Sequence, residues 1–354
     1  MVEMDQTAEG ASALSEEIRS IDRDIMDLIH KRTCLAERIG RMGDMPEKDT
    51  ETEVDVTGTH PESSGYINID AGILEQIAKA FIGEAMDQEH TVPSDTYSKK
   101  VSIVGGAGMM GRWMERFLSK RGCEVRIIDP ASGNGLTLEN TSESDIVVVS
   151  VPIYAADGIL KELDSICRND ALIFDLTSLK TPISKTLTGM AGRRKVCSIH
   201  PMFGPSAESV RGRNLIVCDC GSGEAVDEAV SVFGGMGGNI RVMPIEKHDE
   251  YMSYVLGLSH AVNIAFFTVL ERSGIAYEDM RTVASTTFMK NMETNMSVAS
   301  EDPRLYYDIQ HLNDFRDVMW EMFSDAVDDI KKASRDEDPT EFIKIMNAGR
   351  EYFT

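Results

Sequence analysis

One histidine of this chain lies where acid–base chemistry is easily arranged. Residues 196–205, VCSIHPMFGP, place His200 at the end of a short apolar run that predicts a strand, directly before a bend rich in proline and glycine. The pKa of histidine lies close to neutral pH, so this imidazole can take the proton that a hydroxyl group loses when its carbon is oxidised. The alternative interpretation is a structural histidine at a turn.

A glycine-rich turn upstream of His200 predicts a nucleotide site. Gly106, Gly108 and Gly111 form the pattern G-x-G-x-x-G, which follows a short apolar run and precedes a predicted helix. This context is typical of dinucleotide-binding folds. Gly106 would permit the tight turn, Gly108 would let the backbone approach the pyrophosphate, and Gly111 would allow close packing of helix and strand. A glycine-rich turn without a ligand is the alternative.

Further residues would complete this cofactor site. Met109 and Met110 lie at the start of the predicted helix, whose free amide groups would face the phosphates. Asp129 ends the next predicted strand and would accept hydrogen bonds from ribose hydroxyls while repelling a 2′-phosphate. Val151 and Pro152 end another strand and would line the nicotinamide side. The sequence therefore favours NAD over NADP as the cofactor.

Two more side chains are candidate catalytic residues. Ser178 follows a predicted strand and could orient the imidazole or bond the substrate hydroxyl, although it could equally be a helix N-cap. His260 lies in an apolar segment, where a buried polar group needs a partner, so it either lines the site or is a core histidine. Lys180 is interpreted as a solvated charge, and His248 as a capping or solvent-facing residue.

The elements that must position these residues form an alternating pattern from residue 101 onward. Apolar strands separated by helical stretches predict a Rossmann-like, doubly wound parallel sheet with helices on both faces, a fold of the α/β class. Such sheets bind ligands outside the carboxyl ends of their strands. The strands are expected at 101–104, 124–129, 145–152, 171–178, 196–201, 214–219 and 239–244.

Helical patterns dominate the two ends of the chain. An amphipathic helix is predicted over 14–42, and the acidic stretch 43–65 predicts a disordered insert. The longest apolar run, 254–270, is too short and too polar to cross a bilayer, so we interpret it as a buried core helix. After the last strand, helices are expected at 246–273, 277–293, 302–333 and 339–352.

Four segments follow from these patterns. We expect a small helical module over 1–92, a linker over 93–99, a Rossmann domain over 100–245 and an all-helical domain over 246–354. This order places the predicted cofactor turn and His200 in one domain.

Composition limits the partners and the compartment. The net charge of −23 argues against nucleic acid and against anionic membrane surfaces. The six cysteines show no metal-ligand or redox spacing, so we expect buried free thiols and no metal site. The acidic N-terminus lacks the apolar stretch of a signal peptide, which predicts a cytoplasmic protein.

These motifs resemble those of prephenate dehydrogenases over about residues 100–354. The resemblance implies NAD-dependent oxidative decarboxylation of prephenate to 4-hydroxyphenylpyruvate in tyrosine biosynthesis, with His200 accepting a hydrogen bond or proton from the 4-hydroxyl. It also implies a homodimer through the C-terminal helices and tyrosine as a feedback ligand. The matching runs are GGAGMMGR (105–112), SVP (150–152), DLTSLK (175–180), HPMFGP (200–205), HD (248–249) and DPRLY (302–306).

The chain departs from this family where a cation should bind the substrate carboxylate. The usual arginine position, six residues before the proline of the Asp-Pro pair, holds Ser297. A dianionic substrate still needs a cation. We therefore expect Lys290 to bind the carboxylate, ahead of Arg272, Arg281 and Arg304.

Residues 14–89 resemble the all-helical chorismate mutase that is fused to some such enzymes. Of the cations that would hold its substrate, the chain keeps Arg32, whereas Ser15 and Gly43 occupy two other positions. We therefore interpret this module as degenerate, with a dimerisation or regulatory role. The alternatives are a bifunctional chorismate mutase/prephenate dehydrogenase, an arogenate dehydrogenase, or a non-catalytic NAD-binding regulator.

Overall fold

The computed structural model describes residues 97–354 of the chain. The chain divides into two units, Met1–Pro93 and Ser94–Thr354, and the following description concerns the second. The predicted helical module, its insert at 43–65 and Arg32 lie outside the described residues.

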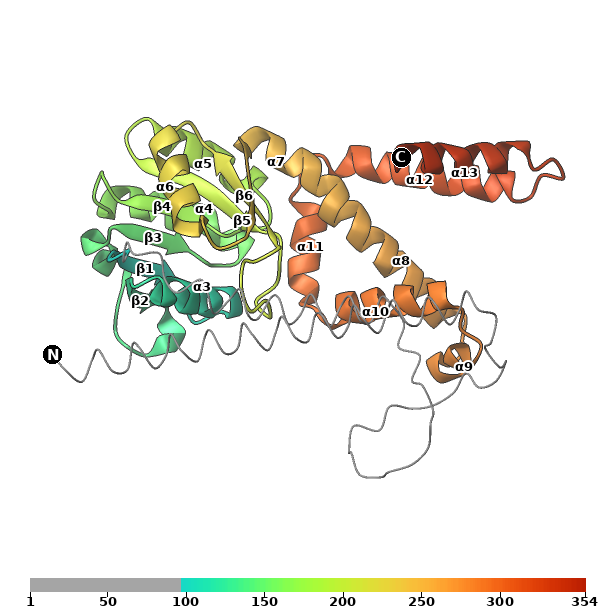
Figure 1. The fold of residues 1–354 in the computed structure, drawn as a ribbon, viewed down its shortest axis with the longest axis horizontal. Helices are drawn as coiled ribbons and strands as arrows, with labels where there is room; N and C mark the ends of the chain where they lie inside the picture. The colour runs from blue at the N-terminus through green and yellow to red at the C-terminus, as the bar shows by residue number, and fades with distance from the viewer. Residues whose placement is uncertain (1–96) are drawn as a thin grey trace, which may run out of the picture. The chain divides into compact units, whose positions relative to one another are not determined.

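A seven-stranded sheet forms the centre of this unit, in the order β2-β1-β3-β4-β5-β6-β7 (Figure 1). Each predicted strand is present, with ends that shift by a few residues at most. The strands are β1 (Lys100–Val104), β2 (Glu124–Ile128), β3 (Ile146–Val149), β4 (Leu172–Asp175), β5 (Lys195–Pro201), β6 (Asn214–Asp219) and β7 (Asn239–Pro244).

One strand pairing corrects the prediction of a parallel sheet. β5 and β6 are antiparallel, with His200 opposite Ile216, whereas the other neighbouring strands are parallel. The connection over 202–213 contains neither helix nor strand. A parallel pairing needs a longer crossover, usually helical, so this short connection returns the chain in the opposite direction. The Rossmann-like fold is thus confirmed with a mixed edge.

Side chains alternate between the two faces of the sheet along each strand, so both faces carry apolar side chains and are covered by helices. Ile103, Phe174 and Ile199 belong to one buried layer, and Val149 and Ile173 belong to the other. The first layer packs against α3 (Met109–Lys120) and α6 (Gly223–Phe233), and the second against α4 (Ile153–Ile166), α5 (Thr181–Ala191) and α7 (Ile245–Met252). Short 3-10 helices, η1 (Pro130–Ser132) and η2 (Leu138–Glu143), follow β2.

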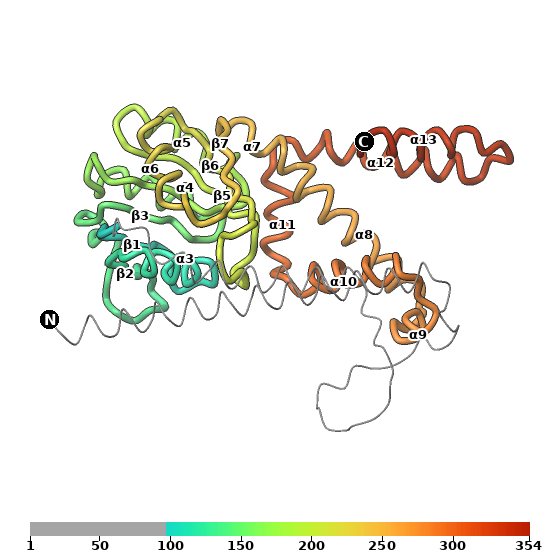
Figure 2. Tube along the Cα trace, in the orientation of Figure 1, coloured from blue at the N-terminus to red at the C-terminus, as the bar shows by residue number. Residues whose placement is uncertain are grey.

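The chain after β7 is helical. α7 continues through a π-helical segment, η3 (Ser253–Leu258), into α8 (Ser259–Arg272). α12 and α13 lie side by side and extend away from the sheet (Figure 2). The predicted helices 277–293 and 302–333 are each divided in two, which gives α9 (Tyr277–Thr282), α10 (Thr286–Ser300), α11 (Pro303–His311) and α12 (Arg316–Ala333). The predicted helix 339–352 is α13 (Thr340–Tyr352).

The expectation of a buried core helix over 254–270 is wrong. The run is helical, but only Gly257 and Ala261 within it are buried. By length and composition the helix Ile245–Arg272 could cross a membrane. That is weak evidence, because its first part holds His248 and Asp249 buried against the sheet domain.

Candidate active site

The glycine-rich turn joins β1 to α3 in the crevice where the strand order reverses beside β1. Gly105, rather than the predicted Gly106, has the left-handed backbone, with φ of 78°. A Cβ on Gly105 would lie 2.3 Å from the Ser150 carbonyl oxygen, and one on Gly106 would lie 2.6 Å from Ile127. A Cβ on Gly111 would lie 2.6 Å from the Gly106 Cα, so this glycine allows α3 to pack on the turn, as predicted.

The start of α3 fits the phosphates of a nucleotide. Among residues 97–354, no acceptor bonds the amide groups of Met109, Met110 or Gly111. Gly108 occupies the N-cap position without a side chain that could block access. Unpaired amides at the positive end of a helix dipole bind anions. The residues present therefore fit the phosphate cradle that the sequence predicts, and their binding of phosphates stays a prediction.

Asp129 lies directly after β2 and holds the turn in place. Its Oδ2 accepts a hydrogen bond from the Ala107 amide at 3.1 Å, and its Oδ1 accepts one from the Ala131 amide at 2.9 Å. Each carboxylate oxygen has a further lone pair for a ribose hydroxyl. The half-buried Val151 and the exposed Pro152, which caps α4, follow β3 beside this turn. Their contacts with a cofactor stay predictions.

His200 is the penultimate residue of β5 and is only 4% exposed. Its Nδ1 lies 3.0 Å from the Nε2 of His248. Burial, and then the nearby His248 and Lys180, lower the pKa of His200 well below its usual value. The imidazole is therefore neutral near pH 7 and can accept a proton.

His248 corrects the interpretation of a solvent-facing or capping residue, because it is fully buried. Its Nδ1 lies 2.6 Å from Oδ1 of Asp249. Asp249 accepts hydrogen bonds from the backbone amides of Lys180 at 2.9 Å and Thr181 at 2.6 Å. These amides open α5, so Asp249 caps that helix from α7. The cap fixes α7, and with it His248, against the sheet domain.

Lys180 is also buried, which contradicts its interpretation as a solvated charge. Its Nζ donates to Oδ1 of Asp175 at 3.1 Å and to the backbone carbonyls of Thr177 at 2.7 Å and Ile199 at 3.0 Å. A buried ammonium group needs such partners for all of its protons. Lys180 thereby joins the end of β4 to the residue before His200.

Ser178 and His260 lie in different surroundings. Ser178 is half-buried after β4 and has no hydrogen bond within the described chain, and the N-cap of α5 is Lys180 instead. The His260 ring stacks on Tyr306, with centroids 4.1 Å apart, and its buried Nδ1 has no partner. Burial lowers the pKa of His260 to about 4. Within residues 97–354, no hydrogen bond or ring contact joins His260 to His200.

Arg304 on α11 is held against the sheet domain. Its guanidinium lies 5.3 Å from the Tyr154 ring centre and 5.6 Å from that of Tyr307. Its Nε donates to Oδ1 of Asp308 at 2.9 Å. Tyr154 lies in the first turn of α4, two residues after Pro152. Arg304 therefore lies near the predicted nicotinamide side of the site.

Lys290, the predicted carboxylate ligand, has no such placement. It is exposed on α10, and within residues 97–354 no ion pair or hydrogen bond positions its ammonium group. Ser297, at the usual arginine position, is exposed on the same helix.

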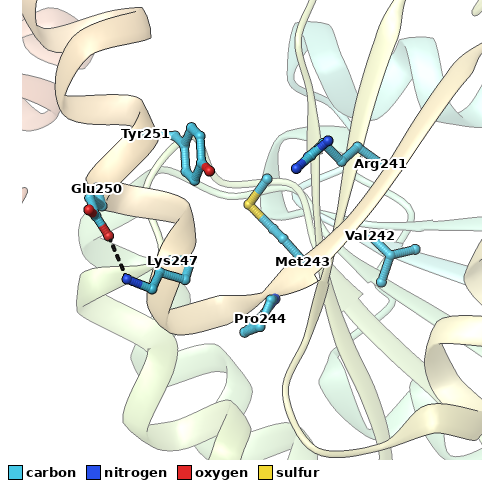
Figure 3. Close-up of a pocket in the computed structure, with 7 residues that line it drawn as sticks. All are labelled: Arg241, Val242, Met243, Pro244, Lys247, Glu250 and Tyr251. Atoms are coloured by element: carbon cyan, nitrogen blue, oxygen red, sulfur yellow. Dashed lines mark hydrogen bonds and ion pairs between the residues drawn. The ribbon is translucent and has the colours of Figure 1, made fainter.

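A cavity of about 280 Å³ is lined by residues of β7 and α7 (Figure 3). Lys247, Glu250 and Tyr251 line it from α7, whereas the intervening His248 and Asp249 face the sheet domain and α5. The cavity is therefore separate from the His200 site. The strand β7 contributes Arg241, Val242, Met243 and Pro244.

Two family models match consecutive parts of the chain. The model of the prephenate dehydrogenase nucleotide-binding domain matches residues 97–242, and that of the prephenate dehydrogenase dimerization domain matches residues 244–348. The chain belongs to the prephenate dehydrogenase family. The predicted enzyme class, an NAD-dependent oxidoreductase of this family, is confirmed.

Individual relatives agree with this membership. The T-protein of Haemophilus influenzae is 25% identical over 354 residues, covering 98% of this chain and 93% of that protein. The T-protein of Enterobacter agglomerans is 25% identical over 306 residues, covering 84% and 81%. A solved prephenate dehydrogenase from A. aeolicus, in complex with hydroxyphenyl propionate and NAD+, shares the fold at a TM-score of 0.57 and 22% identity, covering 74% of this chain and 100% of that one.

Proposed function

We propose that this prephenate dehydrogenase converts prephenate to 4-hydroxyphenylpyruvate and CO2 with NAD+ as the oxidant. The observation that carries the proposal is the neutral, buried His200 at the sheet edge that also holds the phosphate cradle. His200 and the phosphate cradle lie at the carboxyl ends of two parallel strands, β5 and β1, where such sheets bind their ligands. NAD+, when bound, accepts a hydride from C4 of the substrate ring.

His200 acts as the general base and acid of this reaction. Its imidazole takes the proton of the 4-hydroxyl as C4 loses the hydride, which leaves a carbonyl at C4. The bond to the ring carboxylate then breaks, CO2 leaves, and its electron pair passes through the ring to the oxygen. The oxygen takes a proton back as the aromatic phenol forms. The unpaired Ser178 hydroxyl would bond the 4-hydroxyl, and His260 would face the substrate with its unpaired Nδ1.

Arg304 replaces Lys290 as our choice for the substrate carboxylate. The two tyrosine rings and Asp308 hold the guanidinium through its face and Nε, while the side chain stays 63% exposed. Its terminal NH2 groups have no partner within residues 97–354, so they can bond a carboxylate in the bidentate manner typical of arginine.

The C-terminal helices would form a homodimer. Exposed apolar side chains are spread over α8, α10, α12 and α13, and a cavity of about 290 Å³ lies among α8, α9 and α10. A second copy of the chain would cover them, and we expect the dimerisation domain to span 246–354 after a cofactor domain at 100–245. We expect twice the chain mass in solution by light scattering. The exposed residues are Val262, Val269, Met296, Val318, Trp320, Met322, Val327, Ile330, Phe342, Ile343 and Met346.

The N-terminal residues 1–92 would form a chorismate mutase-like module without mutase activity. The similarity to the H. influenzae T-protein extends over 98% of this chain, so it includes most of this segment. With Arg32 as its remaining matched cation, the module would bind chorismate poorly. The acidic chain would act in the cytoplasm, and tyrosine, which resembles the product, would inhibit it.

One assay tests these proposals together. Purified full-length protein is given prephenate, arogenate or chorismate, each with NAD+ or NADP+, and reduced cofactor is followed by absorbance. We expect turnover of prephenate with NAD+ and none of chorismate. Turnover of arogenate alone would overturn the assignment of prephenate as substrate. Turnover of chorismate would show that the N-terminal module is an active mutase and overturn that proposal.

A further inference from the structure

The hydrogen bonds around Asp249 determine where the protons of the two buried histidines lie. A carboxylate only accepts hydrogen bonds, and Asp249 already receives the amides of Lys180 and Thr181. Burial alone would raise the pKa of Asp249, but the bonds from His248, Thr181 and Lys180 outweigh it and lower the pKa. Asp249 is therefore ionised, and the hydrogen in the 2.6 Å contact belongs to Nδ1 of His248.

This assignment extends to His200. Burial lowers the pKa of His248 as well, so its ring is neutral and its Nε2 has a lone pair. The 3.0 Å contact between the histidines then requires that Nδ1 of His200 donates to Nε2 of His248. Nε2 of His200 is left without a hydrogen, and it has no partner within residues 97–354.

We infer that His248 and Asp249 are positioning residues that hold His200 as the tautomer with an unprotonated Nε2. This inference rests on the proposed function, in which that nitrogen receives the substrate proton. The other charged groups near the two histidines are Lys180 and Asp175. Because these two bond each other, they do not determine which nitrogen of either histidine carries the hydrogen. Cys218 on β6 is a neutral thiol, because burial raises its pKa to about 12.

The same pair connects His200 to the helical domain. The backbone carbonyl of Asp249 accepts a buried hydrogen bond from Nδ2 of Asn313 at 2.9 Å. Asn313 lies between α11 and α12, while the Asp249 carboxylate is bonded to α5 of the sheet domain. The tautomer of His200 therefore depends on how α7 is seated between the two domains.

Asp249→Asn tests the inference because the two side chains have the same shape. The amide oxygen of the asparagine can still accept from α5, but its NH2 group must donate to Nδ1 of His248. His248 then donates from Nε2 to His200, which moves the hydrogen of His200 onto Nε2 and removes the base. A comparable carboxylate-to-amide change beside a catalytic histidine lowers kcat by about 10⁴-fold in serine proteases.

We expect kcat to fall by about 10³-fold to 10⁴-fold, with KM and NAD+ affinity within a few-fold of wild type. Nitrogen-15 NMR of histidine-labelled protein reads the tautomer directly and needs no substrate. It should show Nε2 of His200 unprotonated in the wild-type chain and protonated in Asp249→Asn. A protonated Nε2 in the wild-type chain, or an unchanged tautomer in the variant, would overturn the inference whatever the substrate proves to be.

Variants at His248 keep the test decisive if Asp249→Asn does not fold. His248→Gln can donate to Asp249 and accept from His200, so it should keep the tautomer and lose at most about tenfold in kcat. His248→Leu can do neither, and its kcat should fall by at least a further tenfold. Equal kcat in both would contradict a positioning role.

A control separates this role from merely holding α5 in place. Thr186 on α5 donates to Oδ1 of Asp157 on α4 at 2.5 Å and touches neither histidine. Thr186→Val removes a hydrogen bond that holds α5 to α4, so it should lower the melting temperature without changing kcat or the NMR tautomer. If Asp249→Asn behaves like Thr186→Val, Asp249 only holds α5 in place.

Discussion

At the scale of single residues, the site is built from polar and charged groups that are buried with their partners. Lys180, Asp175, His248 and Asp249 are each at most 3% exposed, and each is hydrogen-bonded. Buried charges of this kind cost free energy when one member is removed, because the other is left unpaired. Their arrangement around His200 therefore serves both stability and chemistry.

His200→Asn should abolish the proton transfer while the fold is kept. General acid–base groups contribute about 10²-fold to 10⁴-fold, so kcat should fall by that factor while NAD+ affinity stays near wild type. Stopped assays with prephenate and calorimetric titration with NAD+ measure the two quantities. Turnover at the wild-type rate would remove His200 from the mechanism.

Lys180→Met should destabilise the protein strongly, because it leaves Asp175 buried without its ion pair. We expect a loss of about 3–5 kcal/mol in the free energy of unfolding, measured by urea denaturation. Lys185→Met, at an exposed position of the same helix, is the matched control and should change stability by less than about 0.5 kcal/mol. Similar losses in both variants would contradict the role of the buried pair.

Arg304→Gln should weaken substrate binding rather than chemistry. A hydrogen bond to a charged group contributes about 1.5–3 kcal/mol, so KM for prephenate should rise about tenfold to a hundredfold with kcat little changed. Lys290→Gln removes a charge from the exposed α10 position and should leave KM within twofold. The opposite ranking of the two variants would restore Lys290 as the carboxylate ligand.

At the scale of elements, the turn between β1 and α3 is limited by backbone space. Gly105→Ala would force a left-handed residue and a Cβ into the Ser150 carbonyl. We expect NAD+ affinity to fall at least tenfold, as measured by calorimetry. Gly158→Ala, on α4 with no atom near the added Cβ, should instead stabilise the protein by about 0.5–1 kcal/mol. Equal NAD+ binding in both would show that the turn tolerates a side chain.

Strands and turns could be predicted from the sequence because their signals are local. Runs such as 214–219 and 239–244 match the observed strands to the residue. The antiparallel direction of β6 could not be predicted in this way, because it depends on the absence of a crossover helix from the connection 202–213.

The candidate site was predictable only in part. Its own strand and bend indicate His200, whereas no local pattern indicates that Lys180 or His248 is buried, because lysine is mostly exposed and histidine is only intermediate. Their partners lie far along the chain: the Lys180 amide bonds Asp249 across 69 residues, and His200 meets His248 across 48. The signal that could have indicated them is their place beside predicted strand ends, next to Asp175 and Asp249.

At the scale of the whole molecule, buried neutral histidines make stability depend on pH. Burial lowers the pKa values of His200, His248 and His260, the last to about 4. Unfolded histidines titrate near 6.5, so below that pH the unfolded chain binds more protons than the folded one. Stability should therefore be greatest above about pH 6.5 and fall as the pH drops toward 4. Thermal melts across this range measure it, and a constant midpoint from pH 7.5 to 5 would contradict it.

The π-helical segment between α7 and α8 has a consequence for chain length. A π turn accommodates one residue more than an α turn, and η3 lies between His248 and His260. A chain one residue shorter within 253–258 could form an unbroken α-helix and still direct both histidines as here. One residue removed from the α-helical part between His248 and η3 would instead turn one histidine by about 100° relative to the other. Related chains are thus free to differ by one residue within η3, but not in the α-helical turn that joins it to His248.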